Sequence, residues 1–235
     1  MISRKLTATA VLIASLFGTA AFAGEVADFE RDMRTAYGSY RSALFMTNAN
    51  KPDEAGKAVS AFKQQWSALA AKPVPAQYAD DAQYKTTLDA VTSIAEKAAE
   101  EVSAAKLPEA HETLEKIRDE ISALHERNGM IGFSDRMNAY HAKMEQILGK
   151  TYGGFDAAGF GELREDAAVL AYLAADIAAH PAAEAEDAAY KPLLQAVEAS
   201  SAELVKAARA GDADAARKAV GALKVPYSKF FLKFG

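Results

Sequence analysis

Hydrophobic residues recur along most of the chain at three- and four-residue steps. Residues spaced in this way line one face of an α-helix. Strand-like alternation over several residues is absent. Three clear series are Val59, Phe62, Trp66 and Leu69; Leu88, Val91, Ala95 and Val102; and Leu114, Ile117, Ile121 and Leu124. The pattern predicts an all-α protein, with four helices between Gly24 and Arg127 and four more after them.

Local signals mark several helix ends. Asn50 precedes Pro52 and two acidic residues, which predicts a capped helix start. The run from Lys72 to Pro75 contains two prolines and breaks the chain before the next helix. Gly129 is expected to end a helix, and His180-Pro181 is a typical helix stop.

The second half of the chain repeats features of the first half. A constant offset relates Tyr84-Lys85, Leu88, Val91, Leu114, Ile117 and Gly129 to Tyr190-Lys191, Leu194, Val197, Val220, Leu223 and Gly235. A slightly shorter offset relates Phe29, Met33 and Leu44 to Phe133, Met137 and Leu148. A duplicated unit of this length predicts two tandem antiparallel four-helix bundles, residues 24–129 and 130–235. Chance similarity between alanine-rich segments is the competing explanation.

The N-terminus has the pattern of a secretory signal. Arg4 and Lys5 precede an apolar run from Leu6 to Phe17, and small residues lead to Ala21-Phe22-Ala23. The run is too short for a stable membrane span, so residues 1–23 are predicted to be a signal peptide that is removed. The expected location is a bacterial periplasm.

Composition excludes several kinds of site. The chain has no cysteine, so disulfides, thiolate metal sites and covalent c-type haem attachment are excluded. A net charge of -5 gives no reason to expect nucleic acid as a partner. We expect no membrane span after the signal is removed.

Phe155-Asp156-Ala157-Ala158 opens a predicted helix, Ala210-Gly211-Asp212 precedes the last helix, and Ala222-Leu223 leads into the terminal turn. In these features the chain from about Met137 to Gly235 resembles cytochrome c prime, a periplasmic four-helix bundle with haem at its C-terminal helix. Where that family has its C-x-x-C-H motif, this chain has Tyr227, Phe230 and Phe231. The resemblance therefore implies the fold without the covalent haem, with these three rings filling the space as core. An exposed part of this aromatic cluster would instead be a partner-docking patch.

One helical stripe combines soft metal ligands. Met137, His141 and Met144 are spaced at i, i+4 and i+7, which places two thioethers and an imidazole on one face. This donor set suits Cu(I). Methionines at helical spacing are also common core residues, so the stripe has a purely structural interpretation as well.

Two other histidines are candidate ligands. His111, with Glu115 and Asp119, offers donors that suit zinc or iron, or a solvated helix face with ordinary ion pairs. His125 and Met33 are candidate axial ligands of a non-covalent b-type haem, although the residues after His125 are typical of a solvated helix end.

The leading hypothesis is a non-enzymatic periplasmic binding protein for copper or another transition metal, with Met137, His141 and Met144 as ligands and His111 or His125 as a fourth. The alternatives are a haem-less, cytochrome c prime-like protein-interaction module and a b-type haem protein. A homodimer is compatible with either. No general base with an adjacent nucleophile can be assembled from the sequence, so an enzyme is not expected.

Overall fold

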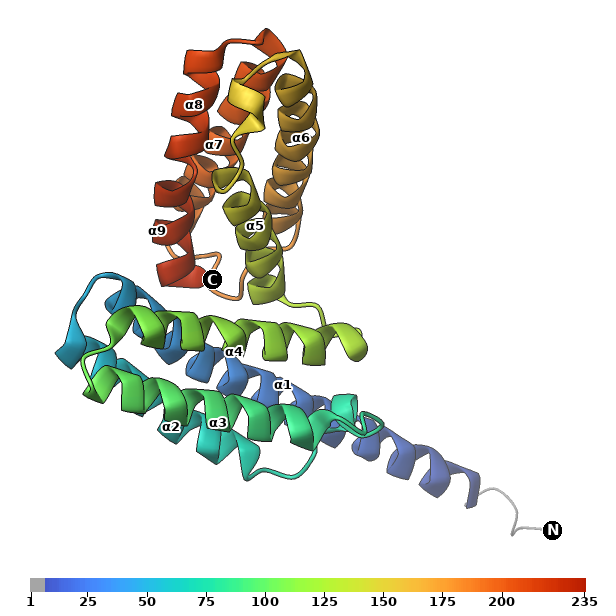
Figure 1. The fold of residues 1–235 in the computed structure, drawn as a ribbon. Helices are drawn as coiled ribbons and strands as arrows, with labels where there is room; N and C mark the ends of the chain where they lie inside the picture. Colours follow the sequence, from blue (N-terminus) through green and yellow to red (C-terminus); the bar gives the residue numbers. More distant parts are fainter. Residues whose placement is uncertain (1–6) are drawn as a thin grey trace. The chain divides into compact units, whose positions relative to one another are not determined.

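The computed structural model describes the backbone of residues 7–235 and the side chains of residues 24–235. Within this part of the chain all regular elements are helical, which confirms the predicted all-α class. The predicted export signal, residues 1–23, lies outside the residues whose side chains are described. The α-helices of the described chain are α1 (Thr7–Asn48), α2 (Pro52–Ala70), α3 (Tyr84–Ser103), α4 (Leu107–Arg127), α5 (Phe133–Leu148), α6 (Ala157–Ala179), α7 (Tyr190–Ala210), α8 (Ala213–Ala222) and α9 (Lys224–Phe234) (Figure 1).

The chain divides into two compact units, Met1–Met130 and Ile131–Gly235. Two short 3-10 turns complete the helical elements, η1 (Ala76–Tyr78) in the first unit and η2 (Tyr152–Gly154) in the second. Where side chains are described, no helix is both long enough and apolar enough to cross a membrane.

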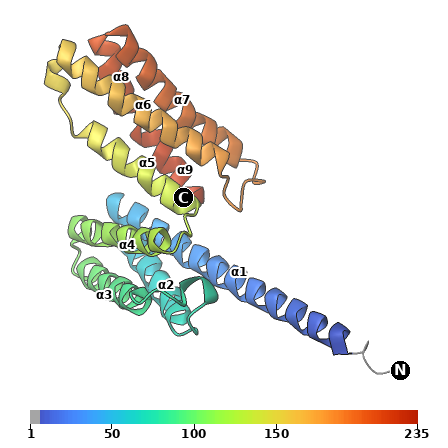
Figure 2. The same ribbon diagram turned by 90° about the vertical axis from the view of Figure 1, so that its right-hand side faces the viewer.

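In the first unit, each helix packs against the next in sequence, and α4 also packs against α1 (Figures 1 and 2). The apolar series read from the sequence forms the core of this unit, because Val59, Phe62, Trp66 and Leu69 are all buried. The indole Nε1 of Trp66 donates a hydrogen bond to the carbonyl oxygen of Leu88 on α3, at 3.1 Å. This bond satisfies the polar atom of a buried ring and ties α2 to α3.

The predicted helix cap at Asn50 is wrong. The residue flanking the start of α2 is Lys51, which makes no side-chain cap hydrogen bond, while Pro52 occupies the first turn as expected. Asn50 has a φ of 55° and lies in the turn that ends α1, where Lys51 N donates to Met46 O at 3.0 Å. Asparagine is one of the few residues that adopts this left-handed conformation readily, so here it ends one helix instead of starting the next. Gly129, with a φ of 66°, plays the same part after α4, as predicted.

In the second unit, α5 packs on α6 and α6 on α7, and both α8 and α9 pack against α7 and α5. The sequence predicts one last helix here, but the structure has two, with a bend at Leu223. Pro226 explains the break. It has no N–H to donate to the carbonyl of Ala222, and its ring interferes with a regular helical turn at that point.

A tight connection joins α5 to α6. Tyr152, Gly153, Gly154 and Phe155 all have positive φ angles, and Asp156 caps α6 by accepting a hydrogen bond from Gly159 N at 2.7 Å. The backbone of Tyr152 comes so close to Gly159 that a Cβ there would collide with the Tyr152 carbonyl oxygen. The connection therefore requires glycine at position 159.

Candidate functional site

Helix α5 places the predicted copper ligands at different depths. The side chains of Met137 and Met144 are completely buried in the structure. His141, between them along the helix, keeps 17% of its side chain exposed. The stripe thus has a buried methionine on either side of a partly exposed histidine, and the expectation that both methionines serve as core residues is confirmed.

The His141 ring has a defined orientation. It stacks on the ring of Tyr227 from α9, with centroids 5.2 Å apart and an angle of 29° between the planes. Its Nε2 lies 3.6 Å from Oε1 of Glu145, one turn further along α5. Stacking covers a face of the imidazole, whereas the nitrogen lone pairs lie in the ring plane. Tyr227 can therefore hold the ring in place by its face without contacting the ring nitrogens.

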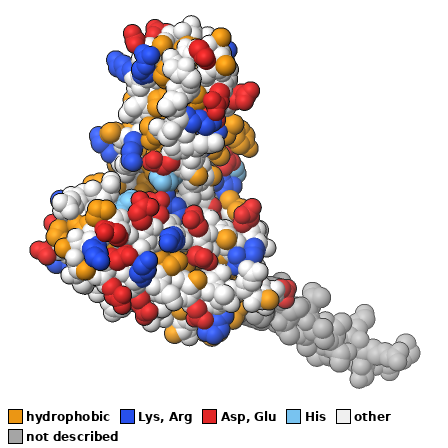
Figure 3. Space-filling model, viewed as in Figure 1, with side chains coloured by type: hydrophobic (Ala, Val, Ile, Leu, Met, Phe, Trp, Pro, Cys, Tyr) orange, Lys and Arg blue, Asp and Glu red, His pale blue; other side chains and the backbone are white. Residues whose placement is uncertain are grey.

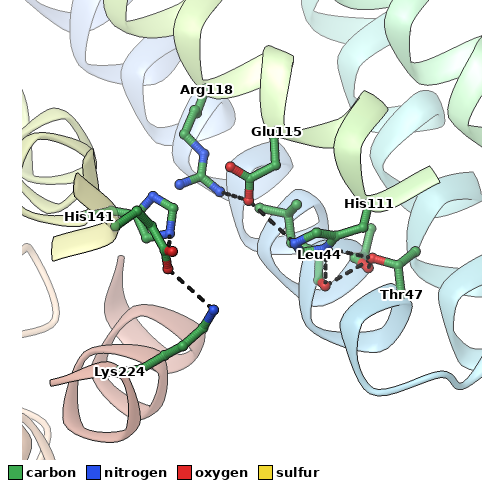
Figure 4. A network of polar contacts seen from close by, with 9 residues as sticks. Leu44, Thr47, His111, Glu115, Arg118, His141 and Lys224 are labelled. Atoms are coloured by element: carbon green, nitrogen blue, oxygen red, sulfur yellow. Dashed lines mark hydrogen bonds and ion pairs between the residues drawn. The ribbon is translucent and has the colours of Figure 1, made fainter. Parts of the chain in front are cut away.

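A lysine from α9 reaches the same carboxylate. Lys224 Nζ lies 3.3 Å from Oε1 of Glu145, so His141 and Lys224 both approach a single oxygen (Figure 4). Glu145 is detectable from the sequence because it follows His141 by four residues, a spacing that places two side chains on one helix face. Lys224 could not be detected in this way, because it comes from a distant part of the chain.

The aromatic residues near the C-terminus fill the core of the second unit. Tyr227, Phe230, Phe231 and Phe234 are all buried, which confirms the prediction that the first three form core. The idea of an exposed docking patch at this cluster is therefore wrong. The rings pack on Phe133, Tyr140 and Tyr190 of the same unit. Burying rings of this size is worth about 2–3 kcal/mol each, which accounts for their position inside.

Tyr140 connects this cluster to α7. Its ring stacks on Tyr227 at 5.7 Å, and its hydroxyl is 2.9 Å from Ser201 Oγ. Burial raises the pKa of the Tyr140 phenol. The phenol therefore stays neutral at ordinary pH and serves as a structural hydrogen-bonding group.

His111 lies between α4 and α1 in the first unit. Its Nδ1 is 3.2 Å from both Leu44 O and Thr47 Oγ1, and its Nε2 is 3.5 Å from Oε1 of Glu115 (Figure 4). Glu115 is also paired with Arg118. The positive guanidinium at this carboxylate disfavours a divalent ion there, and Asp119 is exposed. Through these contacts His111 links α4 to α1. They favour this structural role over that of a zinc or iron ligand.

Met33 and His125 are both buried. Glu126 and Arg127, which follow His125, are exposed, as expected for a solvated helix end. The contact of His111 with Thr47 fixes the register of α4 against α1. Fourteen residues on from His111 is His125, and fourteen back from Thr47 is Met33, so the two lie at a similar level. Rings occupy that end of the unit: Phe29 packs on Tyr78 at 5.7 Å and on Tyr84 at 6.4 Å.

A buried charge cluster in the second unit was not anticipated from the sequence. Asp166 on α6 accepts hydrogen bonds from Lys143 Nζ at 2.6 Å, Lys150 Nζ at 2.8 Å and Tyr152 OH at 2.8 Å. Burial alone would raise the pKa of Asp166, but these three donors outweigh it and the pKa is lowered. The cluster ties α5 and the η2 turn to α6. Lys143, Lys150 and Tyr152 all donate to the same carboxylate, so the cluster has a structural role.

Across the residues with described side chains, no three histidine, aspartate or glutamate side chains gather in a way that could hold a metal ion. On the face drawn in Figure 3, acidic and basic side chains are interspersed, and the overall charge of -5 is small. Comparisons of the chain with protein-family models, with curated proteins and with solved structures found no match.

Proposed function

We propose that the protein is a non-enzymatic binding protein of the bacterial periplasm, and that its ligand is a transition-metal ion, copper first, held by Met137, His141 and Met144. The observation that supports this most is the position of His141. Its ring is oriented by Tyr227 and lies on one stripe of α5 with two buried thioethers.

The donor chemistry points to copper in its reduced state. Thioether sulfur and imidazole nitrogen are soft to intermediate ligands, which Cu(I) prefers over carboxylate oxygen. Buried sulfurs also provide surroundings of low polarity, which favour an ion of low charge. His111 is committed to Leu44, Thr47 and Glu115 in the first unit, so we place the ligands on α5 alone.

The test is elemental analysis of protein purified from the periplasm without chelators. We expect about one copper per chain, and loss of it in Met137→Leu/His141→Phe/Met144→Leu, which keeps similar volumes and a flat ring against Tyr227. The matched control is Met46→Leu/Met130→Leu/His180→Phe, which removes the same residue types elsewhere and should keep its copper. Wild-type protein that stays metal-free after reconstitution with Cu(I) would refute the proposal.

Export is supported by the sequence pattern. Removal of residues 1–23 would leave Gly24 as the first residue. Among the residues with described side chains, residues 24–28 are exposed or half-buried and Phe29 is buried.

The second candidate function is a haem-less, cytochrome c prime-like protein-interaction module. It is favoured by an exposed apolar strip on α6, where Tyr172 is 70% and Val169 46% exposed. Apolar side chains exposed together often mark a protein-binding surface. A partner captured from periplasmic extract by the wild type and lost by Val169→Ser/Tyr172→Ser would support this candidate. Dimerisation would show in sedimentation of the purified protein.

Non-covalent haem binding is the third candidate, and it rests on the shared level of Met33 and His125. The rings of Phe29, Tyr78 and Tyr84 occupy the same end of the unit, so a haem would have to displace packed core. A Soret band in the purified protein, abolished by His125→Ala, would establish this function. A protein that stays colourless after incubation with haemin would refute haem binding.

We further propose that the two units arose by duplication of one four-helix bundle. Four pairs of positions 106 residues apart are buried in both units: Tyr84 and Tyr190, Val91 and Val197, Ala95 and Ser201, and Ile117 and Leu223. In two other pairs, Leu88 and Leu114 are buried, whereas Leu194 and Val220 are half-buried. Limited proteolysis tests the boundary. We expect cleavage between residues 127 and 133 and two protease-resistant fragments, whereas a single resistant core spanning this region would contradict two separate bundles.

A further inference from the structure

Lys224 lies near the partly exposed histidine of the α5 stripe. Its Nζ lies 3.3 Å from Glu145 Oε1, the same oxygen that is 3.6 Å from His141 Nε2 (Figure 4). The lysine ammonium is therefore a positive charge close to any ion that binds Nε2 of His141. Glu145 is the negative group that faces both side chains.

The exposure of the three residues shows that this arrangement is open to solvent. The side chains of Lys224 and Glu145 are both substantially exposed, whereas His141 is mostly covered. An exposed ion pair of this kind contributes little to folding stability. Replacement of Lys224 should therefore leave the fold intact, which makes its electrostatic effect on a neighbouring ion measurable.

We propose that Lys224 determines the metal specificity of the α5 site, by repelling divalent ions more strongly than Cu(I). This inference rests on the proposed function, because it concerns the same site. The repulsion between Lys224 and a bound ion is proportional to the charge of the ion. Cu(II) and Zn(II) carry twice the charge of Cu(I), so each is disfavoured twice as much in free energy.

The size of the effect is calculated for an ion that binds about 4 Å from the Lys224 ammonium. A unit charge at about 4 Å from another, in surroundings as polar as water, changes a binding constant roughly fivefold. Removal of Lys224 should then strengthen Cu(I) binding by roughly fivefold and divalent binding by roughly 25-fold. The ratio of the two affinities should change by roughly fivefold in favour of the divalent ions.

Glu145 has the opposite effect in this arrangement. Its carboxylate attracts any cation, and lies close enough to Nε2 of His141 to bind a divalent ion together with the imidazole. By pairing with Glu145, Lys224 offsets that negative charge. Lys224 thereby reduces the attraction that Glu145 exerts on divalent ions near His141.

The experiment compares the wild type, Lys224→Met and a control, Lys229→Met, which removes an exposed lysine from the same helix. Cu(I) affinity is measured anaerobically by competition with a chromogenic chelator, and Cu(II) and Zn(II) affinities by calorimetry at low ionic strength. We expect the selectivity for Cu(I) to fall roughly fivefold in Lys224→Met and to stay at the wild-type value in Lys229→Met. Circular dichroism confirms that each variant is folded.

One result would overturn the role of Lys224 alone, and another would overturn the copper site as well. If the wild type binds Cu(I) and Lys224→Met has the same selectivity, the role of Lys224 is overturned and the copper site remains. If neither protein binds any of the three ions, the proposed function fails and the specificity proposal fails with it. Glu145→Gln provides a second check, since it should weaken divalent binding more than Cu(I) binding.

Discussion

Tyr227 stacks on His141 across the interface between α9 and α5, with ring centroids 5.2 Å apart. The same tyrosine also stacks on Tyr140 at 5.7 Å and on Phe231 at 5.5 Å, so it lies in the middle of a series of packed rings. Its ring fills core space and orients a histidine.

Because Tyr227 orients His141, two substitutions of this tyrosine should differ in their effect on copper affinity. Tyr227→Phe keeps the stacked ring, so copper affinity should stay within about twofold of the wild type. Tyr227→Leu removes the ring and should lower the affinity about tenfold or more, the size of effect usual for a group that orients a metal-binding histidine. Chelator competition with Cu(I) measures both. Equal affinities for the two variants would show that stacking does not position His141.

The close approach at Gly159 predicts a large loss of stability on adding one methyl group. Gly159→Ala places a Cβ against the carbonyl of Tyr152, so the η2 connection must shift, at a cost of about 3 kcal/mol. Gly161→Ala is the matched control on the same helix, because no heavy atom lies within 4 Å of its added Cβ. Alanine is the better helix former, so the control should be neutral or more stable by up to about 1 kcal/mol. Urea denaturation of both variants decides the matter, and equal midpoints would contradict the described geometry.

Asp166 predicts a specific dependence of stability on pH. The side chain is only 8% exposed, and its replacement by asparagine leaves two lysines without their shared carboxylate, at a cost of about 3 kcal/mol at pH 7. The folded-state pKa of Asp166 lies below its ordinary value, so its stabilising contribution is fully present above the unfolded pKa, near 4. The contribution is lost as the pH falls through the lower, folded pKa.

The measurement is the free energy of unfolding of wild type and Asp166→Asn between pH 2 and pH 7. The gap between them should be widest above about pH 4 and should narrow below it. Asp214→Asn serves as the control, because Asp214 also pairs with a basic residue, Arg217, but is 97% exposed. That change should stay within about 0.5 kcal/mol of the wild type. A gap for Asp166→Asn that is constant across the range would argue against an ionised, hydrogen-bonded carboxylate.

The N-terminal pattern predicts the first residue of the exported protein. Expression of the full chain in a Gram-negative host should give periplasmic protein that begins at Gly24, as read by N-terminal sequencing. Replacing both Ala21 and Ala23 with bulky residues should block cleavage and leave the precursor at the membrane. Cytoplasmic protein that begins at Met1 would contradict export.

The regular part of the fold could be predicted from the sequence because helical periodicity is a local signal. The buried series in α2, from Val59 to Leu69, is one example, and the aromatic core residues Tyr227 and Phe230 are another. Asn50 shows the limit of such local signals. An asparagine beside a proline and acidic residues fits the start of one helix or the end of another, and only the backbone conformation distinguishes them.

The candidate site was predictable only where its residues share a helix. Helix α5 carries Met137, His141, Met144 and Glu145, and the spacing of residues within one helix shows that they lie on the same face. Lys224 and Tyr227 reach them from α9, and a helical pattern contains no information about which residues of two helices meet. For the same reason, the Asp166 cluster could not be predicted from the sequence. Nor could the contact between His111 and Thr47, which are 64 residues apart in the chain.

The bend at Leu223 has a consequence for how this molecule can change over generations. In an unbroken helix, each residue is rotated by a fixed angle relative to the one before, so Tyr227 would be locked in phase with Ala216 and Ala219. The break before Pro226 releases the last eleven-residue helix from that constraint. The rotation of α9 can therefore be tuned by mutation without disturbing α8. Because Lys224 and Tyr227 lie in the first turns of α9, such adjustments would act directly on the surroundings of His141, while most of the bundle stays as it is.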